Sequence, residues 1–220
     1  MPAEKLKPPR GRPRAFDRAA ALQLALDLFL ERGYEGTSIA ELVDAMQISP
    51  PSLYAAFGAK ENLYREAIEL YAEGRGRFVT RALQQDLPVE EQVRQILRDA
   101  ALAFTPVNGA TPGCLVSASM LVCTPDNRGV AEHVKTLRAA PMAALAQRIE
   151  QAKKRGELPA SVNGLTLARF YAAVVTGMAV QARDGAKRRE LLDLVDSAMQ
   201  AWPTLPAGSR TSAGRLVKPR

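Results

Sequence analysis

The chain has 220 residues, of which 47% are hydrophobic, 24% are charged and only 5% are aromatic, with a net charge of +7. This composition excludes a disordered or fibrous protein, because it supplies enough apolar surface for a core of one large domain or two small ones. Alanine and leucine are abundant and runs of β-branched residues are few, so we expect an all-α protein.

The positive charge lies at the two ends of the chain. Residues 1–18 carry six basic side chains against two acidic ones, and residues 207–220 carry four basic side chains and no acid. The residues between them hold 20 basic and 21 acidic side chains, so that the middle of the chain is close to neutral. Such tails are typical either of solvated, disordered ends or of segments attracted to nucleic acid.

No apolar leader follows the sequence MPAEKLKPPRGRPR, and the longest apolar stretch, 170–180, spans 11 residues. A membrane span needs roughly 20. We therefore expect a soluble, cytoplasmic protein without a membrane partner. Cys114 and Cys123 are too few for a disulfide framework and lack the spacing of metal ligands, so we expect reduced thiols and neither a metal nor a cofactor.

Apolar residues at helical spacing predict a first helix after Asp17, which would cap it, ending near Gly33. A second, short helix follows in TSIAELVDAM. There Thr37 or Ser38 can cap the start, and Glu41 stands three residues after Ser38, as in a capping box. In this second helix, Ile39, Leu42 and Val43 would face inward.

The segment ISPPSLYAAFG predicts a third short helix, because proline is tolerated only in the first turn of a helix. Proline restrains the residue before it, so we expect the start near Pro51, with Ser49 or Pro50 as the boundary. Leu53 and Phe57 would face inward. Two short helices joined by a tight turn are typical of the helix-turn-helix motif, whose second helix reads the major groove.

The segments ALDLFLERGYEG and TSIAELVDAMQISPPSLYAAFGAKENLY together resemble the N-terminal domain of the TetR (tetracycline repressor) family of bacterial transcriptional regulators. The resemblance implies a three-helix DNA-binding domain followed by a larger helical domain for dimerisation and effector binding. It also implies phosphate contacts from Thr37, Ser38, Tyr54 and Lys60, and groove contacts from Ser49, Pro51 and Ser52. Ala55 and Ala56 follow the tyrosine, where many members carry a polar aromatic residue, so base reading would depend on hydroxyls and apolar contacts.

The expected reading domain is acidic. Residues 19–65 hold three basic and six acidic side chains, a net charge of −3. Phosphate attraction would then come from the arm that carries Arg10, Arg12 and Arg14, whose extended Arg-Gly-Arg-Pro sequence can enter a minor groove. The alternative is an arm that is merely flexible.

Helical patterns continue over most of the remaining chain, and Pro- and Gly-rich connections separate them. They predict helices over residues 61–84, 89–104, 112–123, 127–155 with a kink or break at Pro141, 165–183 and 187–202. The expected organisation is an arm (1–14), a DNA-binding domain (15–61), an effector and dimerisation domain (62–202) and a disordered basic tail (203–220).

The last two predicted helices are apolar on more than one face, so they must be covered, either within one subunit or by a partner helix. Gly177 would suit a close helix crossing. The C-terminal sequence TGMAVQARDGAKRRELLDLVDSAM also resembles the same family, whose last two helices form a dimer bundle. A homodimer is therefore expected.

Catalysis has little support, because no nucleophile motif accompanies the single histidine, His133, and no phosphate-binding loop occurs. His133 is either a surface or satisfied polar group or a polar group of a pocket. The segment GCLVSASMLVC is either a buried helix with two small thiols or a redox sensor.

The sequence predicts a homodimeric transcriptional repressor that a small hydrophobic effector releases from double-stranded operator DNA. The effector pocket would involve residues of the apolar helix faces, with a solid core as the alternative: Phe104, Leu115, Met120, Cys123, Phe170, Val174 and Met178. Ser117, Ser119 and Thr176 would be polar anchors, for a neutral or weakly polar compound. The rival function is an architectural DNA-binding protein without an effector, and an enzyme is a third alternative.

Overall fold

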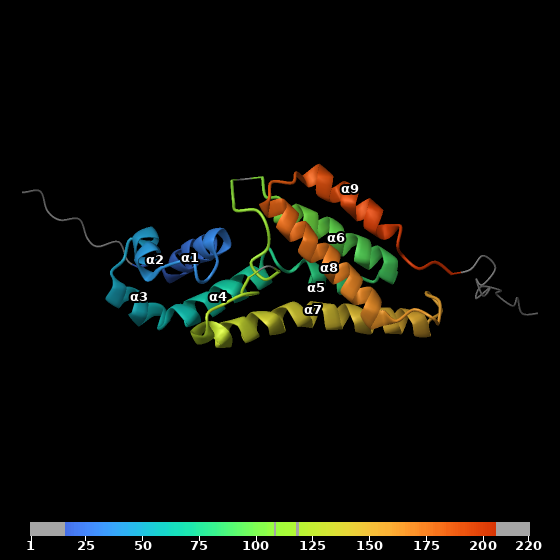
Figure 1. The fold of residues 1–220 in the computed structure, drawn as a ribbon, viewed down its shortest axis with the longest axis horizontal. Helices are drawn as coiled ribbons and strands as arrows, with labels where there is room; N and C mark the ends of the chain where they lie inside the picture. The colour runs from blue at the N-terminus through green and yellow to red at the C-terminus, as the bar shows by residue number, and fades with distance from the viewer. Residues whose placement is uncertain (1–15, 108, 118, 206–220) are drawn as a thin grey trace, which may run out of the picture.

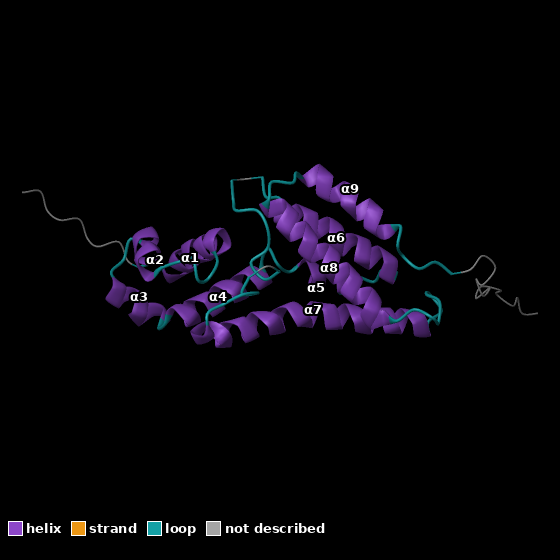
Figure 2. Cartoon of the chain, viewed as in Figure 1, coloured by secondary structure: helices purple, strands orange, loops and turns teal. Residues whose placement is uncertain are grey.

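The computed structural model describes residues 16–107, 109–117 and 119–205, and their regular structure is entirely helical (Figures 1 and 2). Helices α1, α2 and α3 form one end of an elongated molecule, and α6, α8 and α9 form the other, with α4 and α7 running between (Figure 1). The helices are α1 (Arg18–Arg32), α2 (Ile39–Met46), α3 (Pro50–Phe57), α4 (Lys60–Glu73), α5 (Phe78–Leu83), α6 (Val89–Phe104), the 3-10 turn η1 (Pro125–Asn127), α7 (Arg128–Lys154), α8 (Gly164–Arg183) and α9 (Arg188–Met199).

The short N-terminal helices begin where the sequence supplies caps. The Asp17 carboxylate accepts hydrogen bonds from the amides of Ala19 and Ala20, at 3.0 and 3.1 Å. Ser38 forms the expected capping box with Glu41. Ser49 caps α3, which begins at Pro50, one residue before the expected start. Each cap satisfies amides that would otherwise lack partners at a helix N-terminus.

Two apolar cores hold the molecule together. One core joins α1–α3 to α4 and continues into Leu115, Val130 and Val134. The end formed by α1–α3, which is the expected reading end, therefore shares its packing with the start of α7. The other core joins α5, α6, α8 and α9 to the C-terminal half of α7. Helix α4 begins in the first core, and its C-terminal turn reaches the second half of the molecule (Figure 1).

The single helix predicted over residues 61–84 is wrong, because the chain turns between α4 and α5. A Cβ atom at Gly76 would lie 2.8 Å from the ring of Tyr71, so only glycine allows this close approach. Arg75 fixes the turn by donating to the carbonyls of Ala103 at 2.5 Å, Thr111 at 2.8 Å and Gly113 at 3.0 Å.

The helix predicted over residues 112–123 is also wrong: the described residues of this segment form turns. Arginine side chains bind its carbonyls, because Arg75 contacts Gly113, and Arg138 contacts Val116 and Ser119. Met120 adopts a positive φ of 54°, which is incompatible with a right-handed helix. Of the kink or break expected at Pro141, the break does not occur, since α7 continues through this residue.

Among the described helices, α8 is long and apolar enough to cross a membrane by length and composition, with a mean hydropathy of 1.3. It packs against α6, α7 and α9 (Figure 1). Tyr171, Met178 and Ala179 of this helix are buried, whereas Leu165, Phe170 and Val180 are exposed.

Candidate nucleic-acid interface and ligand cavity

The turn between α2 and α3 fixes the angle of the third helix. Gln47 adopts a left-handed conformation with φ of 54° and ends α2, and the amide of Ile48 donates to the carbonyl of Val43 at 3.1 Å. The Ser49 hydroxyl then accepts a hydrogen bond from the Ser52 amide at 3.3 Å, and the Ser49 and Ser52 hydroxyl oxygens lie 2.9 Å apart. The described chain thus contains the two-helix arrangement that the sequence predicts.

Helix α3 presents one face to the core and another to solvent. Leu53 and Phe57 are buried, as expected from their spacing. Pro51, Ser52 and Tyr54 are exposed, and half of the Tyr54 side chain is accessible. The exposed face therefore offers one free aromatic hydroxyl and small side chains that permit close approach to a groove.

The prediction that Thr37 contacts a phosphate is wrong, because Thr37 is fully buried. Its hydroxyl donates to the carbonyl of Gly33 at 2.7 Å, and its amide donates to the carbonyl of Tyr34 at 3.4 Å. Both groups that were expected to bind DNA therefore close the turn between α1 and α2.

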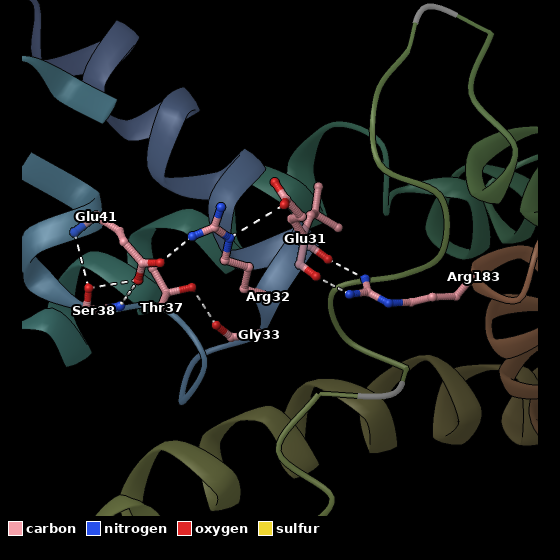
Figure 3. Close-up of polar contacts among 8 residues, drawn as sticks. Glu31, Arg32, Gly33, Thr37, Ser38, Glu41 and Arg183 are labelled. Carbon is pink, nitrogen blue, oxygen red and sulfur yellow. Dashed lines mark hydrogen bonds and ion pairs between the residues drawn. The ribbon is translucent and has the colours of Figure 1, made fainter. Parts of the chain in front are cut away.

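Ser38 is exposed, but its polar groups are also occupied (Figure 3). Its amide and hydroxyl each donate to the Glu41 carboxylate at 2.7 Å. The hydrogen bond from the Ser38 amide is the main cause of the lowered pKa of Glu41. The Glu41 carboxylate therefore stays ionised beside the expected phosphate position. Arg32 pairs with Glu41 and balances its charge. The phosphate contact of Ser38 stays a prediction.

Lys60 begins α4, and its ammonium group lies 4.3 Å from the centre of the Tyr34 ring. Partial burial lowers the pKa of Lys60, and the cation–π contact stabilises the charged form. The ammonium is thus held near the start of α4, where the sequence expected it. Its contact with a phosphate stays a prediction.

Sequence reasoning missed Arg18, which holds the reading end together. Its Nη2 donates to both carboxylate oxygens of Glu66, at 2.8 and 2.7 Å, and its guanidinium lies 4.5 Å from the centre of the Phe57 ring. No local pattern announces this contact, because Arg18 and Glu66 are distant in sequence. Arg10, Arg12 and Arg14 lie outside the described residues.

The reading end is tied to the rest of the molecule at both sides of the turn between α1 and α2. Glu35 accepts hydrogen bonds from the Thr124 amide at 2.7 Å and from the Asn127 side chain at 2.8 Å, just before α7. The bond from Asn127 is the main cause of the lowered pKa of Glu35. On the other side, Arg183 of α8 donates to the carbonyls of Leu30 and Glu31 in the last turn of α1 (Figure 3).

A cavity of about 550 Å³ lies among α4, α5, α6, α7 and α8, so the alternative of a solid core is wrong. This volume falls in the usual range of small-molecule sites. Its walls are largely apolar. They include Phe78 of α5, Val93 and Ile96 of α6, Met142 of α7 and Tyr171 of α8. None of the residues proposed as its apolar lining from the sequence lies in this wall.

The structure gives each of those residues another place. Phe104 and Met178 are fully buried in the core, and Val174 packs against it. Phe170 is 42% exposed, and Cys123 is half-buried. Leu115 and Met120 line a second cavity of about 480 Å³ between the reading end and α8.

The residues expected as polar anchors lie in different places. Ser117 and Thr176 do line the larger cavity, whereas Ser119 lines the second one. His133 lies on α7 outside both linings, and its Nε2 is buried without a hydrogen-bond partner among the described residues, so the expectation of a satisfied polar group is wrong. Burial is the main cause of the lowered pKa of His133.

Comparison with known proteins decides the family. Residues 21–67 match the family described as "Bacterial regulatory proteins, tetR family". The HTH-type transcriptional repressor ComR of Escherichia coli (strain K12) is 36% identical over 203 residues, covering 91% of this chain and 95% of ComR. The chain belongs to the TetR family.

Two further relatives agree with this TetR assignment. The repressor BdcR of the same organism is 29% identical, over 89% of this chain and 93% of BdcR. A solved structure of the TetR regulator CifR, a cysteine mutant complexed with 26-base-pair operator DNA, has 42% identity and a TM-score of 0.81, covering 88% of this chain and all of that chain. These relatives are transcriptional regulators and not enzymes. The protein is a TetR-family, DNA-binding transcriptional repressor.

Proposed function

We propose that the protein is a ligand-responsive repressor, which a small molecule with an apolar body releases from a near-palindromic operator. The observation that carries this proposal is the path of α4. Its Leu63 and Tyr64 lie in the core of the reading end, while Tyr71 and Ala72 line the cavity. A ligand that favours one position of α4 also favours one position of the reading helices, which is a population shift.

In this proposal, Ser49, Pro51 and Ser52 face the groove, while Tyr54 and Lys60 contact phosphates. The exposure of Pro51, Ser52 and Tyr54 supports these roles. The basic arm with Arg10, Arg12 and Arg14 supplies the phosphate attraction that the acidic reading end lacks. Thr37 has a structural role instead, while Ser38, which is exposed, keeps its predicted phosphate contact.

The proposed assembly is a homodimer in the cytoplasm, formed through α8 and α9. Exposed Phe170, Ala173 and Val180 share one face of α8 with Gly177. No atom lies within 4 Å of the position of a Cβ at Gly177, so this face is open within one subunit. Apolar side chains exposed in a row are typical of an interface.

The experiment combines a thermal-shift screen of small apolar metabolites with operator binding. A specific ligand should raise the melting temperature, because binding to the folded state stabilises it. The same ligand should release operator DNA. Binding to all DNA with steep salt dependence, with no ligand altering it, would instead favour the rival function of an architectural DNA-binding protein.

A further inference from the structure

The wall of the larger cavity holds two cations, of which Lys135 is paired with Glu132 at 3.0 Å and Arg138 is paired with no carboxylate of the described residues. Among the described residues that line it, none is aspartate or glutamate, while Lys135 and Arg138 of α7 both contribute to its wall. These two side chains are three positions apart and therefore share one face of the helix. An apolar cavity with cations and no acid at its wall is complementary to an amphipathic anion.

Arg138 is held in place by the protein backbone. Its Nη1 donates to the carbonyls of Ser119 at 2.7 Å and Val116 at 3.1 Å. These two bonds, both from Nη1, are the only hydrogen bonds of this guanidinium to the described residues. Burial lowers the pKa of Arg138, which shows that its charge is partly desolvated. The remaining donors are thus preorganised and free for an anion.

Tyr71 provides a second polar group in the wall of the cavity. Its side chain is 1% exposed, and its hydroxyl has no hydrogen-bond partner among the described residues. Burial raises the pKa of Tyr71 well above its ordinary value, and the Cys114 thiol and the Leu115 backbone lie near the hydroxyl. Buried polar groups are usually satisfied, so a buried hydroxyl on a residue that lines the cavity is suited to donate to a polar group of a bound ligand.

We propose that the cavity binds a singly charged amphipathic acid, with its carboxylate at Arg138, its apolar body among Phe78, Val93 and Ile96, and the Tyr71 hydroxyl donating to it. Lys135 lies at the exposed side of the cavity, where its pairing with Glu132 makes it a weaker contributor than Arg138. The inference rests on the proposed effector role of this cavity and names its ligand class. It differs from the neutral compound that the sequence suggested, because the α7 cations come to the cavity only through folding.

Calorimetric titration of the full chain with octanoate and with octan-1-ol tests the assignment, since the two probes share an apolar body and differ in charge. Octanoate should bind about tenfold more tightly, which corresponds to about one charge-assisted hydrogen bond. Arg138→Gln should abolish this preference, and Lys135→Gln should reduce it. Arg128→Gln, on an exposed position of the same helix outside the cavity, is the matched control and should leave it unchanged.

Tyr71→Phe separates a binding role from a structural one. It should weaken octanoate binding without lowering the melting temperature of the free protein, because the lost hydroxyl has no internal partner. Equal affinity for the two probes, binding of neither, or full octanoate affinity in folded Arg138→Gln and Lys135→Gln variants would overturn the assignment. Operator release by octanol alone would support the proposed function and overturn the anionic ligand class. Octanoate binding without operator release would support the ligand class and contradict the proposed function.

Discussion

The guanidinium of Arg183 donates to the backbone carbonyl of Glu31, although the two residues lie on different halves of the molecule (Figure 3). Arg183 ends α8, and Glu31 lies in the last turn of α1, where carbonyls lack helical partners and a cation is favourable. A second bond from Arg183 to Leu30 strengthens the link. The helix of the proposed dimer face is thereby attached to the first helix of the DNA reader.

Replacing Arg183 by alanine should weaken the coupling between the cavity and the reader. We expect the ratio of operator affinities without and with effector to fall, with a loss of about 1 kcal/mol in the free energy of unfolding, since water competes for this exposed side chain. Fluorescence anisotropy with operator DNA and chemical denaturation measure the two effects. Arg169→Ala, also exposed on α8, is the control, and an unchanged ratio in Arg183→Ala would refute the coupling.

Thr37→Val should lower stability rather than DNA contact. The substitution leaves the Gly33 carbonyl without its partner in a buried turn, which costs roughly 1–3 kcal/mol. Thr136→Val removes a similar bond to the carbonyl four residues earlier at an exposed position, and should have little effect. If the Thr37→Val variant were instead fully stable but bound operator poorly, the Thr37 hydroxyl would contact a phosphate after all.

The exposed groups of the reader should affect DNA binding in two different ways. Tyr54→Phe and Lys60→Ala should weaken binding to all sequences, and the lysine variant should reduce the salt slope by about one. Ser52→Ala should change the preference among operator sequences. Titrations at several salt concentrations distinguish these outcomes, with Lys154→Ala as a control for charge removal far from the reader. If the Lys60→Ala variant kept the full salt slope, the Lys60 ammonium would not contact a phosphate, and its contact with the Tyr34 ring would be its only role.

Gly177→Trp should disrupt the proposed dimer while each subunit stays helical. The open space around Gly177 accommodates a large side chain within one subunit, but not at a close helix crossing. Light scattering reports the mass and circular dichroism reports the helix content. Ala143→Trp, on an exposed position of α7, is the control. If the Gly177→Trp variant remained a dimer, Gly177 would not lie in the interface.

Local signals in the sequence predict the reading end well, because caps and periodicity act over a few residues. Ser38, Glu41 and Ser49 occupy the cap positions expected of them, and Leu53 and Phe57 are buried. The same locality explains the failure at Thr37. Its hydroxyl could bond either a phosphate or the preceding turn, and only the folded turn decides between them.

The cavity could not be predicted in this way, because its wall forms from five helices. Apolar periodicity identifies faces that are buried, but it does not separate a filled core from a cavity wall. Phe104 fills the core, while Tyr71 lines the cavity. The segment 112–123 depends on Arg75 and Arg138, whose distant side chains bind its carbonyls in place of helical hydrogen bonds.

Selection of DNA sequences from a random pool by the full chain tests the central claim most directly, since a two-fold dimer presents two identical reading helices. The account predicts a near-palindrome whose half-site centres lie about one helical turn, or a small multiple of it, apart. Selected sequences without two-fold symmetry, or no enrichment at all, would contradict it.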